Sequence, residues 1–136
     1  MLPNKKSIIE IDGLKIAIQD KSSIVSEPTT ILLIHGLSMD CRIWERQFED
    51  PQLDHLRLVT IELPGHGQSS IPMHPAVGYS FEVLGILINK ITKRLNIDNY
   101  IIAAVSLGAN ITLQASSHLP GCKGLFAMTV PFSKPP

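Results

Sequence analysis

The sequence predicts an α/β fold, a mostly parallel sheet with an N-terminal antiparallel hairpin and helices on both faces. From residue 31 onward, short apolar runs typical of buried strands alternate with stretches of helical periodicity. Before them, two runs of alternating polarity flank an Asp-Gly pair, which is a hairpin signal. Apolar residues make up 44% of the 136 residues, enough for a hydrophobic core.

The first elements are a hairpin and a buried strand. Residues 7–11 and 14–18 are rich in isoleucine, and the Asp-Gly pair between them tolerates positive φ. After a polar loop, the apolar run at 31–34 predicts a buried strand, which we expect to be parallel. Residues 40–50 have apolar side chains at helical spacing, and aromatic residues in such a pattern are more often core than pocket lining.

The second half alternates strands and helices. Ser80 is placed to cap a helix whose apolar residues recur every three or four positions. Pro120 and Gly121 are expected to end the next helix. The predicted elements are a strand at 58–61, a turn-rich loop at 62–69, a helix from 81 to about 95, a strand at 100–105, a helix at 107–119 and a strand at 125–130.

Composition excludes several classes of function. Twelve basic and twelve acidic residues cancel, so nothing favours nucleic acid or an anionic membrane as a partner. Charged residues interrupt the N-terminal apolar pattern, and no run is long enough to span a membrane. Cys41 and Cys122 lie far apart, which indicates neither a disulfide framework nor a metal site. We therefore expect a cytoplasmic protein without nucleic acid or membrane as a partner.

Ser106 lies where a predicted buried strand passes through a tight turn into a helix. Ala104 and Gly108 are small residues two positions before and after it, which lets the strand and the helix come close. Such a turn exposes the serine hydroxyl as a nucleophile, and the backbone amide of Leu107 faces the same space. The alternative is an ordinary serine that caps the helix. The buried strand and the small neighbours favour the nucleophile.

Three motifs together resemble the α/β-hydrolase fold family, and the resemblance covers nearly the whole chain. They are the strand that ends in His35-Gly36, the loop at 62–69 and the turn around Ser106, in the order that members of that family show. Glu62 stands where the family more often has aspartate. The resemblance implies a serine hydrolase that acts through an acyl-enzyme on a small-molecule substrate, namely an ester, a thioester or a related carbonyl compound.

The resemblance also implies roles for individual residues. Ser106 is the nucleophile, and the backbone amides of Leu37 and Leu107 form the oxyanion hole. Supporting positions are expected for His35, Gly36, Ala104 and Gly108. His66 is expected to serve a structural turn, and no cofactor or metal is implied.

The usual partners of such a serine are missing from the second half of the sequence. After Asp98 there is no acidic residue, and His118 is the only later histidine. It lies about three helical turns from Ser106, too far for direct contact. The family order is serine, acid, histidine. We therefore expect residues 1–136 to be the N-terminal part of one α/β-hydrolase domain of about 250 residues, without its later strands, cap, catalytic acid and histidine.

This interpretation has a structural consequence and leaves two alternatives open. The strand at 125–130 would be an exposed apolar edge of the sheet, through which the isolated chain would self-associate. One alternative is a noncatalytic binding protein on the same scaffold, because a fold does not fix a function. The other is an inactive fragment.

Overall fold

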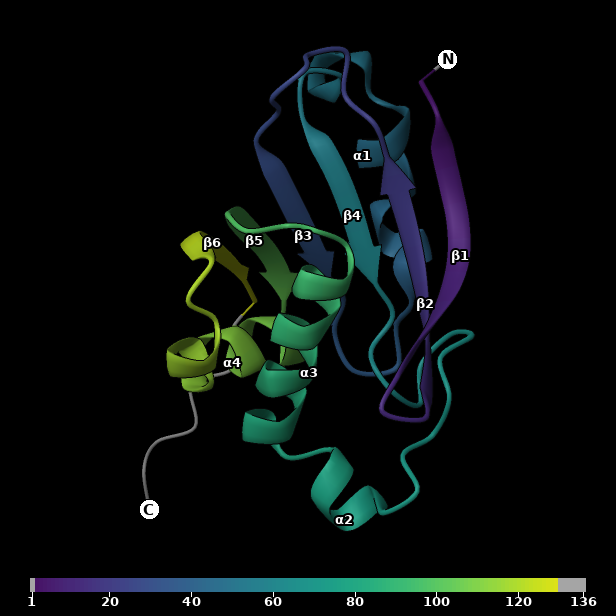
Figure 1. Cartoon of the computed structure of the whole chain (residues 1–136), viewed down its shortest axis with the longest axis vertical. Coiled ribbons are helices and arrows are strands. Elements are labelled where there is room, and N and C mark those ends of the chain that lie inside the picture. Colours follow the sequence, from purple (N-terminus) through teal and green to yellow (C-terminus); the bar gives the residue numbers. More distant parts are fainter. Residues whose placement is uncertain (1, 130–136) are drawn as a thin grey trace.

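The computed structural model describes residues 2–129, which contain one six-stranded sheet (Figure 1). The strand order is β1-β2-β4-β3-β5-β6, with β1–β2 and β2–β4 antiparallel and the other neighbours parallel. The predicted mixed sheet with an N-terminal hairpin is confirmed. The strands are β1 (Asn4–Ile11), β2 (Leu14–Lys21), β3 (Thr30–Ile34), β4 (Arg57–Ile61), β5 (Tyr100–Val105) and β6 (Cys122–Met128).

The hairpin turn depends on positive φ at both of its central residues. Asp12 has φ 51° and Gly13 has φ 81°, the combination that a two-residue turn between twisted strands requires. The pairing runs from Asn4 opposite Lys21 to Ile11 opposite Leu14, so both strands are longer than predicted. The extension is polar in sequence, and its side chains add polar contacts to the backbone pairing, among them Gln19 with Asn4 and Lys21 with Asp54.

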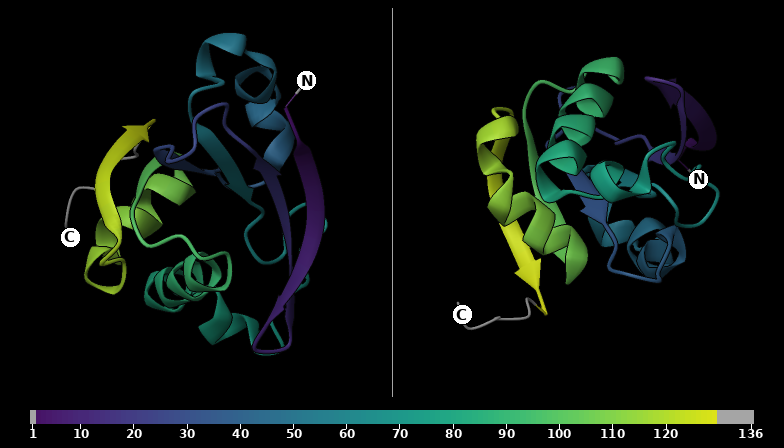
Figure 2. Two further views of the ribbon diagram at one scale, coloured as in Figure 1. Left: turned by 45° about the horizontal axis from the view of Figure 1, so that its top comes forward. Right: turned by 90° about the horizontal axis from the view of Figure 1, so that it is seen from below.

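Helices cover both faces of the sheet (Figure 2). Leu32 and Ile34 of β3 face the larger core cluster, which contains the buried side chains of α3 and α4. Leu33, between them, packs with Trp44 and Phe48 on the other face. The α-helices are α1 (Glu45–Glu49), α2 (Pro75–Gly78), α3 (Phe81–Arg94) and α4 (Leu107–Gln114), and short 3-10 helices are η1 (Cys41–Trp44), η2 (Pro51–Leu53) and η3 (Ser116–His118).

The helix predicted from Ser80 is confirmed. The Ser80 hydroxyl accepts a hydrogen bond from the Val83 amide at 3.2 Å, and Leu84, Ile88 and Ile91 are buried on one face. The helix predicted for 107–119 is wrong in its second half, because α4 ends at Gln114 and η3 follows. Serine competes for backbone hydrogen bonds in a helix interior, and the sequence continues Ser116-Ser117.

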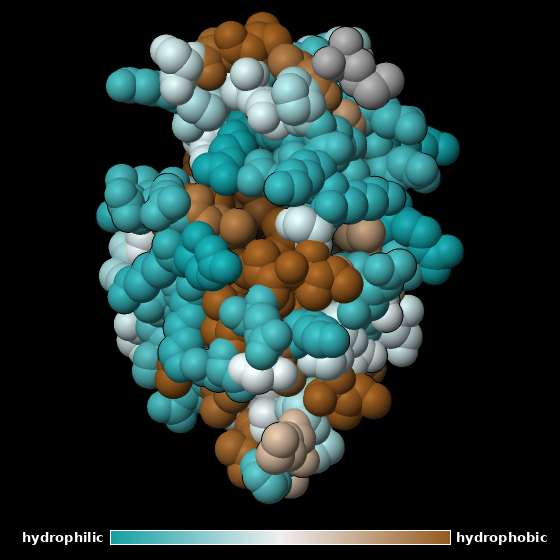
Figure 3. All heavy atoms as spheres, turned by 45° about the vertical axis from the view of Figure 1, so that its right-hand side comes forward, coloured by the Kyte–Doolittle hydropathy of each residue, from teal (hydrophilic) through white to brown (hydrophobic). Residues whose placement is uncertain are grey.

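The sheet leaves β6 at its edge among the described residues. It pairs with β5 alone, and the Phe126 side chain is 69% exposed. The strand begins at Cys122, earlier than predicted, and ends at Met128; predicted Val130 lies outside the described residues. On the side of the molecule where β1 lies, hydrophobic residues gather in a hollow that hydrophilic residues surround (Figure 3).

None of the helices within residues 2–129 is long and apolar enough to cross a membrane.

Truncation of Ile88 tests the larger core cluster. Ile88 is completely buried, so Ile88→Ala should lower the free energy of unfolding by about 2–5 kcal/mol through lost burial and a residual cavity. Ile8 is 52% exposed, so Ile8→Ala should change the free energy of unfolding by no more than about 0.5 kcal/mol. Urea denaturation followed by circular dichroism measures both. Equal losses in the two variants would contradict this packing.

We propose that the edge at β6 causes the isolated chain to self-associate. An unpaired strand with an exposed aromatic side chain is a template for edge-to-edge pairing. Phe126→Lys should therefore shift the chain toward monomer in sedimentation velocity experiments, whereas Val77→Lys, at a similarly exposed apolar residue of helix α2 away from the sheet edges, should not. A wild-type chain that is monomeric at all concentrations would contradict the prediction.

Candidate active site

Ser106 joins β5 to α4 in a backbone conformation that an L-residue rarely adopts. Its φ is 49° and its ψ is −108°, outside the helical, extended and left-handed helical regions. The Ser106 amide donates to the Met128 carbonyl at 2.9 Å, which ties the turn to β6. Its side chain makes no capping hydrogen bond to α4, so the helix-cap alternative is wrong for this serine.

Glycine at 108 allows the start of α4 to pass directly against the end of β3. A Cβ at this position would lie 2.7 Å from the His35 carbonyl oxygen and 2.8 Å from that of Ile34. Both neighbours are backbone atoms, which cannot swing aside. Ala104, on the preceding strand, is completely buried. The small residues around Ser106 are therefore required by the crossing of strand and helix.

The His35-Gly36 loop lies against Ser106. A Cβ on Gly36 would be 3.3 Å from the Ser106 Cβ, and Met39 would also touch it. Leu37, the next residue, is 66% exposed. Leu107 opens α4, and its backbone N–H is one of those that have no acceptor within the helix. The structure thus brings together Ser106, the loop at 35–37 and the N-terminus of α4.

His35 is completely buried and connects two loops. Its Nε2 accepts a hydrogen bond from the Leu63 amide at 3.0 Å, and its Nδ1 lies 2.7 Å from the Gly36 carbonyl oxygen. Because Nε2 accepts, the proton of the neutral ring is on Nδ1 and is donated to Gly36. Burial is the main cause that lowers the pKa of His35 below its ordinary value of 6.5. Both ring nitrogens are therefore occupied by the backbone.

The loop at 62–69 is held by hydrogen bonds of its own. Ser69 donates to the Glu62 carbonyl at 2.6 Å and accepts from the Ala17 amide at 2.9 Å. His66 contacts the Pro64 carbonyl through Nδ1, and its ring centre is 4.9 Å from that of His35. His66 thus belongs to the turn, as the sequence led us to expect.

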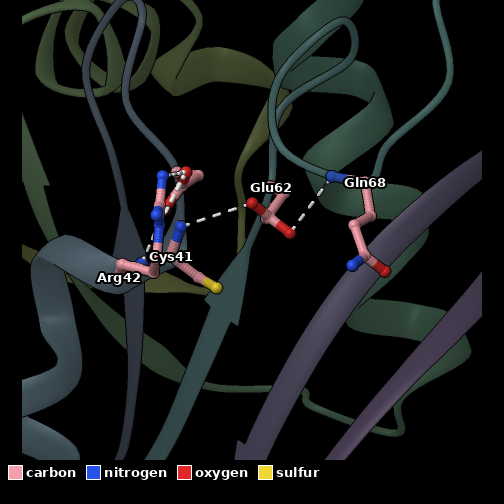
Figure 4. Close-up of polar contacts among 5 residues, drawn as sticks. Cys41, Arg42, Glu62 and Gln68 are labelled. Atoms are coloured by element: carbon pink, nitrogen blue, oxygen red, sulfur yellow. Dashed lines mark hydrogen bonds and ion pairs between the residues drawn. The ribbon is translucent and has the colours of Figure 1, made fainter.

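The Glu62 carboxylate joins this loop to the segment that opens η1. It accepts from the Cys41 amide at 3.3 Å and from the Gln68 amide at 3.4 Å (Figure 4). A side chain at Gly67 would overlap this carboxylate. Sequence reasoning assigned Glu62 no such role, because its partner Cys41 is remote along the chain.

The other candidates lie apart from the turn at Ser106. Trp44 and Phe48 are both 5% exposed and belong to the core, as expected. His118 lies 3.5 Å from a Glu82 carboxylate oxygen. In the part of the chain from residue 2 to 129, no hydrogen bond joins the Ser106 hydroxyl to a histidine. Met39, which the sequence offered with Trp44 and Phe48 as a candidate pocket-lining residue, is 38% exposed and lies beside Gly36.

These features coincide with a known family. A family model described as the alpha/beta hydrolase fold matches residues 29–136. The chain belongs to the alpha/beta hydrolase fold family. It is 33% identical over 96 residues to 2-succinyl-6-hydroxy-2,4-cyclohexadiene-1-carboxylate synthase of Citrobacter koseri, covering 70% of this chain and 36% of the relative. It is 25% identical over 84 residues to AB hydrolase superfamily protein YisY of Bacillus subtilis, covering 62% of this chain and 30% of that relative.

Solved structures agree on the fold. N-acyl homoserine lactonase AidH, in complex with N-butanoyl homoserine, superposes with a TM-score of 0.83 at 27% identity, over 93% of this chain and 45% of that one. An epoxide hydrolase of Vigna radiata superposes with a TM-score of 0.82 at 21% identity, over 96% of this chain and 41% of that one. At this identity the similarity supports the fold alone. The chain spans about a third of the length of the curated relatives that it matches.

The buried His35 predicts a pH dependence of stability. Its pKa is lowered in the fold, so between that value and 6.5 the unfolded chain binds a proton that the folded chain does not. The contribution of His35 is therefore complete above pH 6.5 and is lost as the pH falls. Urea denaturation at pH 7 and pH 5 should show this decline, with a smaller slope for His35→Gln. Exposed His55 provides the control variant, His55→Gln. If the decline in the free energy of unfolding disappeared in His55→Gln but remained in His35→Gln, it would not come from His35.

Proposed function

We propose that the protein represented by this chain is a serine hydrolase that cleaves an ester, a thioester or a related carbonyl compound through an acyl-enzyme. The observation that carries the proposal is the backbone of Ser106 at the junction of β5 and α4. A conformation of this kind costs about 1–3 kcal/mol and persists where function uses it. The turn holds the hydroxyl beyond the end of a parallel strand, where sheets of this class bind ligands.

The oxyanion that forms during the reaction would be bound by two backbone amides. The Leu107 amide opens α4, where the helix dipole favours negative charge. The Leu37 amide is the second donor in this proposal, because Gly36 lies against Ser106. Such donors stabilise the transition state more than the ground state, because the charge develops only there.

The chemistry then takes two displacement steps. The Ser106 oxygen forms a bond to the carbonyl carbon while its proton passes to a base, and the tetrahedral intermediate expels an alcohol or a thiol that takes this proton from the base. Water, deprotonated by the same base, then attacks the acyl-enzyme, and the bond to Ser106 breaks as the base returns the proton to the Ser106 oxygen and the acid is released. The protein groups that this scheme places at the carbonyl are the Ser106 hydroxyl and the two amides.

The base is not among the groups that already have structural partners. His35 uses both ring nitrogens for backbone hydrogen bonds, and His66 contacts Pro64. None of the five histidines, all of which lie within the described residues, is hydrogen-bonded to the Ser106 hydroxyl, so we assign the catalytic histidine and its acid to residues outside these 136. The isolated chain would then hold Ser106 in position without a base to activate it.

A noncatalytic binding protein is the competing function. The observation that favours it is that no histidine is hydrogen-bonded to the Ser106 hydroxyl within the described residues. The two functions differ in what Ser106 does in the complete protein, where a base either reaches its hydroxyl or does not.

Labelling with a fluorophosphonate distinguishes these functions. In the full-length protein we expect rapid labelling and ester hydrolysis, and Ser106→Ala should abolish labelling and lower kcat by at least about a thousandfold. The isolated 136-residue chain should label far more slowly, because no base activates the hydroxyl.

Exposed Ser117 provides the matched control. Ser117→Ala should leave both labelling and hydrolysis unchanged. A full-length protein that binds small esters but is not labelled at Ser106 would establish the binding function instead. Fast labelling of the isolated chain would show that the base lies within it.

A further inference from the structure

A cavity of about 450 Å³ lies at the β1–β2 hairpin and does not include the turn at Ser106. Its walls come from β1, β2, the end of β4, the segment that opens η1 and the loop after Glu62. Its polar lining includes Asp40, Cys41, Thr60 and Glu62. Within the described residues, the cavity shares no lining residue with the groups proposed for catalysis.

Three potential metal ligands converge at this cavity. The ligand atoms of Asp40, Cys41 and Glu62, namely two carboxylate oxygens and one thiol sulfur, all lie within 4.8 Å of one another. Figure 4 shows Cys41 and Glu62 side by side, from two different segments of the chain. In a tetrahedral zinc site with bonds of about 2.0–2.3 Å, ligand atoms are somewhat closer together, a change that side-chain rotation can supply.

A buried hydroxyl at the same cavity is an independent observation. Thr60 lies in β4, and Glu62 directly follows the last residue of that strand. Thr60 lines the cavity and is only 1% exposed, yet its Oγ1 has no hydrogen-bond partner among the described residues. Buried hydroxyls are nearly always paired, so a polar occupant of the cavity would account for this one.

The two carboxylates differ in what they already bind. Asp40 accepts from the Arg42 amide and in three contacts from the Arg42 guanidinium, the shortest at 2.7 Å, which uses the about four acceptor sites of a carboxylate. The Arg42 side chain is 84% exposed, so it can turn into solvent when a cation takes its place on Asp40. The hydrogen bonds to Glu62, at 3.3 and 3.4 Å, are long. A cation between the two carboxylates would therefore replace the guanidinium contacts of Asp40 and leave those of Glu62 in place.

We propose that Asp40, Cys41 and Glu62 bind a divalent transition-metal cation of the zinc class at the cavity that Thr60 also lines. A thiolate with two carboxylates suits zinc, whereas calcium and magnesium prefer oxygen ligands alone. On binding, the Cys41 thiol releases its proton to solvent and its sulfur donates an electron pair to the metal. The bound ion would fasten the segment at 40–41 to the loop that begins at Glu62.

Titration of the folded chain with Co²⁺ tests this site. Co²⁺ reports thiolate ligation through a ligand-to-metal charge-transfer band in the near ultraviolet. We expect one Co²⁺ per chain with this band, displaced by Zn²⁺ but not by Mg²⁺. Cys41→Ala should abolish the band, and Glu62→Gln should weaken Co²⁺ binding at least tenfold.

Cys122, the other free cysteine, gives the matched control. Cys122→Ala should retain the band and the stoichiometry. The proposal is overturned if the folded wild-type chain shows no thiolate band, or if the band survives in Cys41→Ala. Circular dichroism of each variant separates loss of ligation from loss of fold, and Cys41→Ser provides a second, nearly isosteric variant if Cys41→Ala does not fold.

Discussion

The close approach between the start of α4 and the end of β3 is the constraint on which the site depends. Two main chains meet where Gly108 passes the carbonyl groups of Ile34 and His35, and no side chain fits between them. The chain leaves β5 and must enter α4 within a single residue to reach this contact. That residue is Ser106, and its positive φ follows from the crossing. The same approach brings Gly36 against Ser106.

His35 extends this constraint to the neighbouring loop. Its buried imidazole forms hydrogen bonds with two backbone groups that solvent does not reach, the Gly36 carbonyl and the Leu63 amide. Buried polar groups that are fully paired specify one arrangement, since every alternative leaves a donor or an acceptor unsatisfied. The loop at 35–37 and the loop at 62–69 are therefore positioned by polar pairing, while the two hydrophobic clusters hold the sheet and helices behind them.

Elements whose boundaries are set locally could be predicted from the sequence. The strands at 31–34, 58–61 and 100–105 are apolar runs bounded by turn residues, and the Asp-Gly pair fixed the hairpin. The end of α4 was predicted too late, at the Pro120-Gly121 stop, because the local signal of Ser116-Ser117 is weak and the contact of α4 with α3 is remote in sequence. A side chain at Gly85 of α3 would overlap Ala115, so the two helices are in contact just where α4 stops. The irregular register between Tyr100 and Ile101 likewise shifts the pairing of β6.

The same distinction separates the two sites. The turn at Ser106 is formed by five consecutive residues, 104–108, and could therefore be identified from the sequence alone. The group at Asp40, Cys41 and Glu62 exists only after β4 has placed Glu62 beside the segment that opens η1. The Glu62 side chain is one methylene longer than the aspartate that the α/β-hydrolase fold family more often has at this position. The extra length lets the Glu62 carboxylate accept hydrogen bonds from both the Cys41 and the Gln68 amides. A side chain at position 67 would overlap that carboxylate, so glutamate at position 62 requires glycine at position 67.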